Sequence, residues 1–275
     1  MNVYRDKVAF VTGAAFGIGR ALCRELATNG AGVIATDIDE ELLEQAMETS
    51  STQKVKGARL DVTDYEEFKK LIEETISEEG RLDYLFNNAG IAIAAEVRDV
   101  SIDHWRKVLD VNLNGVVYGS TLAYQFMAKQ GSGHIVNLVS VEGLLPFPVT
   151  VSYVTSKFAV VGLSQGLWVE GADLGVKVSA VCPAFVWTPI LDNGPVINFS
   201  REDLRESLRP WLRFAISPEA CAHAILKGVA RKKRIITVSW LTHVMWWLTR
   251  ISPALVMNLV RGDFRKWRGK RGQTA

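Results

Sequence analysis

The chain has 275 residues, of which 48% are hydrophobic and 23% are charged, so it is long enough to bury about 70 to 75% of its unfolded surface in a sizeable core. Its three cysteines, Cys23, Cys182 and Cys221, are far apart, which argues against a disulfide framework and against a cysteine metal site. The first residues lack signal-peptide character. We therefore expect reduced thiols, no bound metal and a cytoplasmic location.

The net charge of +2 is distributed unevenly along the chain. Residues 231–275 contain eleven lysines and arginines and one acidic side chain, Asp263, whereas the preceding residues contain 21 basic and 29 acidic side chains. The C-terminal segment is therefore expected to differ from the body in the surfaces that it can bind.

The first predicted elements are a strand over residues 8–11, a glycine-rich turn over residues 12–19 and a helix after it. Glycines let the backbone approach a pyrophosphate, and the N-terminus of the following helix offers unpaired N–H groups. A glycine cluster in this strand, turn and helix context favours phosphate binding. The expected contacts to a dinucleotide are Gly13, Phe16, Gly17, Ile18 and Gly19.

A second apolar strand over residues 32–36 ends at Asp37. A carboxylate at this place can accept hydrogen bonds from the adenosine ribose and would repel a 2′-phosphate, which favours NAD over NADP. The alternative is that Asp37 is the N-cap of the helix that begins near Asp39.

The pattern then repeats, with helices over residues 40–49 and 65–79 and strands over residues 55–60 and 84–86. This alternation predicts an α/β protein with a doubly wound, Rossmann-like parallel sheet and helices on both faces. Ligands bind at the carboxyl ends of such strands. Polar or small residues follow two of these ends, which makes Asp61, Val62, Asn88, Ala89 and Gly90 candidate cofactor contacts, although the asparagines are also common turn formers.

Residues 101–130 predict one long helix or two abutting helices, and they contain a polar Asn112 between Val111 and Leu113. A buried strand over residues 135–139 ends at Ser140, and Tyr153 follows on a helix with Lys157 four residues later. That spacing places the phenol and the ammonium side by side. The cation is expected to lower the phenol pKa from its ordinary value of about 10 and so prepare it for proton transfer.

With these residues in place, the chain resembles the short-chain dehydrogenase/reductase family in its single-domain form, from about Lys7 to about Val238. The motifs that match are the glycine-rich turn, Asp61 with Val62, the segment 87–90, Asn112, Ser140, and Tyr153 with Lys157. The resemblance implies that Tyr153 is the general acid/base and that Ser140 orients the substrate oxygen. It also implies that Lys157 lowers the pKa of Tyr153 and binds the nicotinamide ribose, and that Asn112 holds a water linking Lys157 to solvent.

The resemblance also implies a nicotinamide contact from the segment 183–188, with Pro183, Val186 and Thr188 as candidates, and an assembly of two or four identical subunits. Two positions depart from the family pattern. Ala184 stands where the family usually has glycine, and Val139 precedes Ser140 where a second serine is common. Neither change removes a reacting group.

Residues 189–217 follow the nicotinamide segment and carry many bulky apolar side chains, and the loop between Ser140 and Tyr153 adds more. We interpret them as a mobile lid over an apolar pocket, with ordinary core packing as the alternative. Glu142 lies near the expected pocket mouth, where a solvated carboxylate is the simpler interpretation and a contact to a polar substrate group the other.

The segment 239–275 is predicted to be a basic, tryptophan-rich helical tail to a catalytic and dinucleotide-binding domain over residues 1–238. Its apolar stretch is interrupted by Arg250 and Pro253 and is too short for a transmembrane helix. The sequence leaves three roles open for this tail: a helix pair on an anionic membrane, packing against another subunit, or a cover over the active site. No nucleic-acid-binding fold surrounds the basic residues.

The sequence thus predicts an oxidoreductase that transfers a hydride between NAD(H) and an apolar secondary alcohol or ketone of lipid, steroid or isoprenoid type. An NADPH-dependent carbonyl reductase and a non-catalytic, redox-sensing NAD-binding scaffold are the alternatives. The sequence does not indicate the individual substrate, the physiological direction or the number of subunits.

Overall fold

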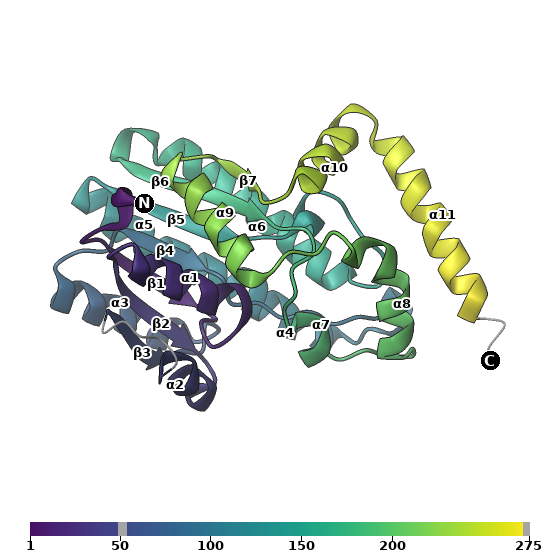
Figure 1. The fold of residues 1–275 in the computed structure, drawn as a ribbon, viewed down its shortest axis with the longest axis horizontal. Helices are drawn as coiled ribbons and strands as arrows, with labels where there is room; N and C mark the ends of the chain where they lie inside the picture. The colour runs from purple at the N-terminus through teal and green to yellow at the C-terminus, as the bar shows by residue number, and fades with distance from the viewer. Residues whose placement is uncertain (49–53, 272–275) are drawn as a thin grey trace.

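A computed structural model describes residues 1–48 and 54–271 of the chain (Figure 1). Its centre is a seven-stranded parallel sheet in the order β3-β2-β1-β4-β5-β6-β7. The strands are β1 Val8–Thr12, β2 Gly32–Asp37, β3 Val55–Arg59, β4 Tyr84–Asn87, β5 Gly133–Leu138, β6 Val176–Cys182 and β7 Ile235–Thr237. The predicted doubly wound parallel sheet is confirmed.

Helices cover both faces of the sheet, as the alternation of apolar strands and amphipathic helices predicts. One face carries α1 Gly17–Thr28 and α9 Pro218–Ala230, with α2 Glu40–Glu48 at the β2–β3 end, and the other carries α3 Tyr65–Glu79, α5 Gly115–Gln130 and α6 Val151–Glu170. Adjacent residues of one strand enter opposite cores: Val11 packs with Leu22 and Leu26 of α1, whereas Phe10 stacks on Phe68 of α3. Burial on both faces explains why β1 and β2 are largely apolar, whereas the edge strand β3 is largely exposed and contains Lys56 and Arg59.

The predicted boundaries hold to within one or two residues, with one informative exception. The long helical pattern over residues 101–130 is two helices, α4 Ile102–Leu109 and α5, joined by a π-helical turn over Asp110–Asn114 that contains Asn112. The predicted end of the second helix at Thr49 lies outside the described residues. The three cysteines are free and buried, as expected.

The strand order reverses between β1 and β4, because β2 and β3 lie on one side of β1 while β5, β6 and β7 continue on the other. Such a reversal opens a crevice at the carboxyl ends of the strands. The loops that follow β1, β4, β5 and β6 therefore meet at one edge of the sheet.

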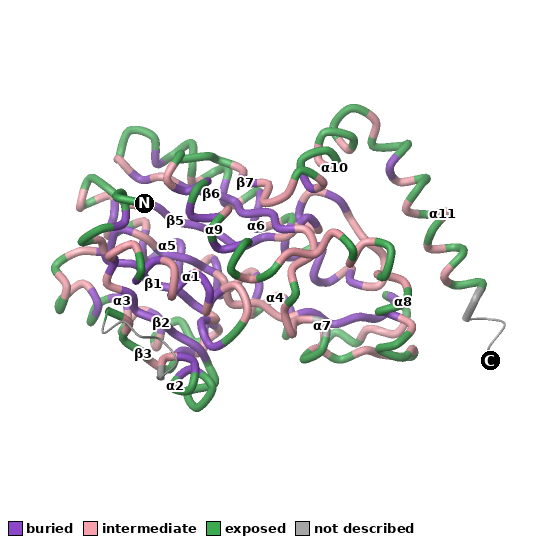
Figure 2. The backbone as a smooth tube through the Cα atoms, in the orientation of Figure 1, coloured by how far each residue is buried: buried purple, intermediate pink, exposed green. Residues whose placement is uncertain are grey.

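The last two helices form what we call the C-terminal arm, α10 Trp240–Ile251 and α11 Pro253–Arg271. The arm extends from the end of β7 past α8 Arg201–Leu212, and α7 Ile190–Asn193 lies on the same side of the molecule (Figure 1). Most of the arm is exposed or half-buried, in contrast to the sheet (Figure 2). Within residues 1–48 and 54–271, no helix is both long and apolar enough to cross a bilayer.

Candidate active site

The glycine-rich turn between β1 and α1 is held in one conformation by backbone constraints and by β4. Gly13 has a φ of +66°, where only glycine is comfortable, and a Cβ at Gly19 would collide with the carbonyl oxygen of Gly13. The side-chain amide of Asn88 donates to the carbonyl oxygens of Thr12 and Gly13 at 2.9 and 2.8 Å, and the Thr12 hydroxyl accepts from the N–H groups of Asn88 and Ala89, both at 3.0 Å. The asparagine therefore fixes the turn.

The start of α1 is suited to an anionic group. Phe16 occupies its N-cap position, and no side chain caps the helix there, so the first-turn N–H groups remain available. Gly13, Phe16, Gly17 and Ile18 line a large cavity at this point. An uncapped helix N-terminus behind a glycine-rich turn fits the pyrophosphate of a dinucleotide.

Asp37 at the end of β2 is buried and faces the same turn. One carboxylate oxygen accepts from the N–H of Ala15 at 3.0 Å and the other from the N–H of Asp39 at 3.2 Å. The alternative role of Asp37 as N-cap is wrong, because Asp39 accepts the capping hydrogen bond from the N–H of Leu42. The carboxylate of Asp61 accepts from the N–H and the hydroxyl of Thr63, which fixes the turn after β3.

Asn112 satisfies its side chain internally, as its apolar neighbours require. Its amide oxygen accepts from the N–H of Ile91 at 2.8 Å, and its amide nitrogen donates to the carbonyl of Ile91 at 2.8 Å and to the Ser156 hydroxyl at 3.3 Å. The π-helical turn brings this fully buried amide to the loop after β4. Asn112 therefore connects the loop after β4 to α6.

Tyr153 and Lys157 lie on the first turns of α6, both buried. The ammonium of Lys157 is 5.3 Å from the centre of the Tyr153 ring and donates to the carbonyl of Leu138, at the end of β5, at 2.8 Å. Ser140 lies two residues beyond β5, and its hydroxyl contacts Tyr153. The structure thus brings together the hydroxyl, phenol and ammonium that the sequence predicted.

The electrostatics of the pair differ from the sequence expectation. Burial raises the pKa of Tyr153, the charge of Glu142 raises it further, and the hydrogen bond with Ser140 lowers it. Burial also lowers the pKa of Lys157 to about 8, against the opposing charges of Cys182 and Glu142. The expected depression of the phenol pKa is therefore not seen here, because burial and the charge of Glu142 raise the pKa by more than the hydrogen bond with Ser140 lowers it. The sequence analysis had assigned the carboxylate of Glu142 to solvent.

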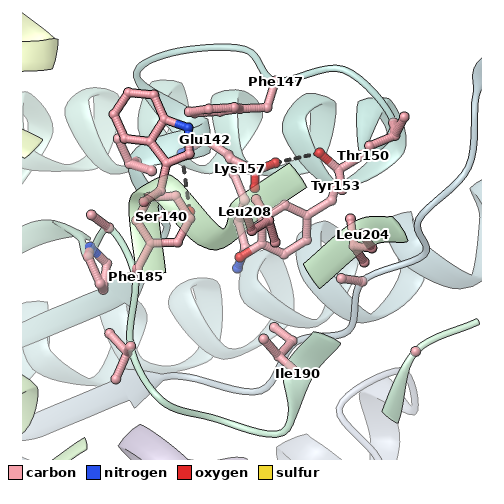
Figure 3. Close-up of a pocket in the computed structure, with 18 of the residues that line it drawn as sticks. Ser140, Glu142, Phe147, Thr150, Tyr153, Lys157, Phe185, Ile190, Leu204 and Leu208 are labelled. Atoms are coloured by element: carbon pink, nitrogen blue, oxygen red, sulfur yellow. Dashed lines mark hydrogen bonds between the residues drawn. The ribbon is translucent and has the colours of Figure 1, made fainter. Parts of the chain in front are cut away.

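That carboxylate belongs to Glu142, on the 3-10 turn Val141–Gly143. Its N–H donates to the Ser140 hydroxyl at 3.1 Å, and its Oε2 accepts from the Thr150 hydroxyl at 2.7 Å. Burial raises the pKa of Glu142 to about 7, although Thr150 and Lys157 lower it. The simpler expectation of a solvated loop carboxylate is wrong, because the turn directs the side chain inward, beside Tyr153 (Figure 3).

These groups share one cavity of about 1100 Å³. Most of the predicted site residues line it: Gly13, Phe16, Gly17, Ile18, Asn88, Ala89, Gly90, Ser140, Tyr153, Lys157, Pro183, Val186 and Thr188. Five predicted site residues do not line the cavity: Gly19, Asp37, Asp61, Val62 and Asn112. Gly19 and Asn112 contact residues that do line it. Asp37 is the last residue of β2, and Asp61 and Val62 follow β3.

The remaining walls of the cavity are largely apolar. They come from the predicted lid segment, through Ile190, Leu204, Leu208 and Trp211, and from the C-terminal arm, through Met245, Leu248, Val256 and Phe264 (Figure 3 labels part of the set). The arm therefore borders the site, which the sequence analysis left open. The lid and the arm also pack together, with Phe199 against Trp267 at 5.3 Å between ring centres.

Comparisons with known proteins agree with this geometry. The family model described as short chain dehydrogenase matches residues 7–195. The chain is 34% identical over 82% of its length to an uncharacterized oxidoreductase of Staphylococcus saprophyticus, covering 90% of that protein. It is 37% identical over 80% of its length to 3-oxoacyl-(acyl-carrier-protein) reductase of Thermotoga maritima, covering 89% of that protein.

Among solved structures, a short-chain dehydrogenase/reductase from Burkholderia phymatum in complex with NAD superposes with a TM-score of 0.84 and 29% identity, over 93% of this chain and 96% of that one. The matched residues include the glycine-rich turn, the loop after β4, Ser140, Tyr153 and Lys157. The chain therefore belongs to the short-chain dehydrogenase/reductase family and is an oxidoreductase of the nicotinamide-dependent class.

Proposed function

We propose that this protein interconverts an apolar secondary alcohol and its ketone with NAD(H) as the hydride carrier. The observation that carries the proposal is that Ser140, Tyr153 and Lys157 line the same cavity as the glycine-rich turn, while the lid and the arm close that cavity with apolar side chains. Such a cavity selects by shape and desolvation, with a few polar groups to fix orientation.

NAD(H), when bound, would supply or accept the hydride. Tyr153 would exchange a proton with the carbinol or carbonyl oxygen, and Ser140 would hold that oxygen by a hydrogen bond. Lys157 would keep a positive charge beside Tyr153, so that loss of the phenolic proton is less costly. Asn112 would act through position, because it holds the loop after β4 against α6.

The substrate class is inferred from the cavity walls. A lipid, steroid or isoprenoid-like alcohol would replace water along the apolar side chains of the lid and the arm, at about 25 cal/mol per Å² of apolar surface removed from water. A sugar would leave most of its hydroxyl groups without partners on the same walls.

The test is turnover by the purified protein. NAD+ reduction with long-chain and polycyclic secondary alcohols is expected to exceed NAD+ reduction with polyols, and Tyr153→Phe should lower kcat by roughly 10²- to 10⁴-fold while NADH binding persists. Turnover of polyols alone would contradict the substrate class. A Tyr153→Phe variant that keeps full cellular function would instead favour a scaffold that binds NAD without catalysis.

We further propose that NAD is preferred over NADP. Asp37 places a buried carboxylate beside the turn that would face the adenosine ribose, and a 2′-phosphate there would meet like charge. The Burkholderia relative in complex with NAD supports the same choice. Asp37→Ala should weaken the preference, measured as the ratio of NADH to NADPH dissociation constants. An unchanged ratio would contradict the role given to Asp37. Tighter binding of NADPH than of NADH by the wild type would restore the NADPH-dependent carbonyl reductase as the alternative.

We also propose that the C-terminal arm contacts an anionic membrane surface. Trp240, Val244, Trp247 and Ile251 recur at helical spacing on one exposed face of α10, and Ile251 is 75% exposed. Exposed basic side chains of the same arm include Arg250 on α10 and Arg261 and Arg265 on α11.

Flotation with vesicles that contain anionic lipid tests the membrane contact. Ile251→Ser should reduce flotation, whereas Leu174→Ser, an exposed leucine outside the arm, should not. Equal flotation of both variants would leave subunit packing as the role of the arm, within the homodimer or homotetramer that the family resemblance implies. Size measurement by light scattering distinguishes these assemblies.

A further inference from the structure

Beside the reacting groups lies a polar pair that the proposed chemistry does not use. The Thr150 hydroxyl donates a hydrogen bond of 2.7 Å to Glu142. Both residues line the same cavity as Tyr153 and Lys157 (Figure 3). Oε2 of Glu142 is occupied by Thr150, while among the described residues no hydrogen-bond partner appears for Oε1. A carboxyl oxygen inside an apolar cavity is costly unless something binds it.

The chain holds this pair in place at some energetic cost. Thr150 is the N-cap residue of α6, and the preceding Val149 has a φ of +62°, a conformation that is strained for a β-branched residue. The carbonyl of Val149 accepts from the N–H of Ala95 at 2.7 Å, which fixes this turn against the chain after β4. Strained backbone that the surroundings enforce tends to mark functional positions.

We propose that Glu142, supported by Thr150, binds a second hydroxyl group of the substrate, so that the preferred substrates are apolar diols or hydroxyketones. This inference rests on the proposed function. A hydroxyl suits the site because it can donate to the carboxylate and can also pair with the protonated carboxyl group. Glu142 is thereby a specificity-determining residue, and the proton of the reaction remains with Tyr153.

The charged and titratable neighbours support this assignment. Tyr153 and Lys157 on α6 share the inner part of the cavity with Glu142. The fully buried Cys182 at the end of β6 does not line the cavity, and its charge would act on Tyr153 and Lys157. The outer part has Lys107, Asp203, Glu206, Asp263 and Lys266. Of these, Asp203 already accepts from the N–H of Ser200 and the other four side chains are exposed, so Glu142 is the acid placed beside the reacting groups.

The test compares alcohols that differ by one hydroxyl, with NAD+ as the acceptor. We would measure kcat/KM for cyclohexanol and vicinal cyclohexanediol, and for a straight-chain secondary alcohol and the vicinal diol of the same length. Wild-type protein is expected to prefer the diols by roughly 10- to 100-fold, the range for a hydrogen bond to a charged group. Glu142→Leu should lower this ratio toward one, and Thr150→Val should lower it partly.

The pH dependence of the ratio separates a binding role from a structural one. Because burial raises the pKa of Glu142 to about 7, the diol preference should increase between pH 6 and pH 8 as the carboxylate forms. Glu142→Gln should abolish that increase. Titration of Lys157 affects the alcohol and the diol alike and therefore cancels in the ratio.

The outcomes are distinguishable. Equal kcat/KM for alcohols and diols in the wild type, or a ratio that Glu142→Leu leaves unchanged, overturns this inference and leaves the proposed function standing. If the wild-type protein binds NADH and turns over none of these alcohols or their ketones, the proposed function fails and the inference fails with it. If Glu142→Leu does not fold, Thr150→Val and Glu142→Gln still decide.

Discussion

The turn that would hold the cofactor and the walls that would hold the substrate are built in opposite ways. The backbone of the glycine-rich turn is close-packed at Gly13 and Gly19, and the hydrogen bonds of Asn88 tie it to the chain directly after β4. The lid and the C-terminal arm meet through aromatic contacts, Phe199 with Trp267 and Phe214 with Trp240. The arm is also tied to the body by the ion pair of Arg268 with Glu96, and much of its apolar surface is exposed. The first arrangement suits one invariant ligand, whereas the second can adapt to a substrate.

The largest expected effect is from a methyl group added to the turn. Gly19→Ala would place its Cβ against the carbonyl oxygen of Gly13 and close to the side-chain amide of Asn88, so the backbone itself must shift. Overpacking of this kind costs about 3 kcal/mol or more when backbone is the obstacle. We expect a loss of NADH binding together with a lower midpoint of urea unfolding. Normal NADH affinity in this variant would show that the turn is more adaptable than its packing indicates.

Glu142 lines the cavity that the two regions share, and the pH dependence of stability tests whether its carboxyl group is buried there. A carboxyl group whose pKa rises on folding, here from 4.5 to about 7, binds its proton more tightly when folded. Its ionisation therefore costs no stability below about pH 4.5, a growing amount between about pH 4.5 and pH 7, and a constant amount at higher pH.

Glu142→Gln removes this cost. The variant should be more stable than the wild type at pH 8 by about 1 to 3 kcal/mol, limited because Lys157 loses a counter-charge, and should show little gain at pH 5. Urea unfolding of both proteins at pH 5 and pH 8 measures this difference in stability. An equal difference at pH 5 and pH 8 would contradict the burial of a titrating carboxyl group.

The same contrast separates the features that could be predicted from the sequence from those that could not. The sheet and the positions of Tyr153, Lys157 and Ser140 were predictable, because strand and helix periods and i, i+4 spacing are local properties. The inward turn of Glu142 was not, since it depends on Thr150 and on lid residues far along the chain. The rise of the Tyr153 pKa on burial was equally hidden, because burial is a property of the whole fold.

A smaller effect is expected where the arm is tied to the body. The guanidinium of Arg268 pairs with the buried carboxylate of Glu96 at 2.5 Å, and Arg98 also approaches that carboxylate at 3.3 Å. Arg268 is largely exposed, so its removal should cost only about 1 kcal/mol or less. Arg268→Ala should increase the rate of proteolytic cleavage in α11 by a few fold and weaken turnover of bulky substrates more than of small ones.

Arg265→Ala is the matched control for this arm contact. Arg265 is exposed on the same helix, and no ion pair with it is found within the described part of the chain. The control removes the same charge without touching Glu96. If both variants are cleaved equally fast, net charge and not the Glu96 contact sets the mobility of the arm.

The smallest effect is expected when a glycine of the arm, and not of the turn, is replaced by alanine. A Cβ at Gly262 on α11 would meet no atom within 4 Å, whereas at Gly19 it meets backbone. Alanine favours a helix over glycine by up to about 1 kcal/mol, so Gly262→Ala should leave NADH binding unaltered and raise the stability of α11 slightly. Amide hydrogen exchange along α11 measures this. Faster exchange in Gly262→Ala would contradict this expectation. It would indicate that α11 bends at Gly262 and is not one continuous helix beside the cavity.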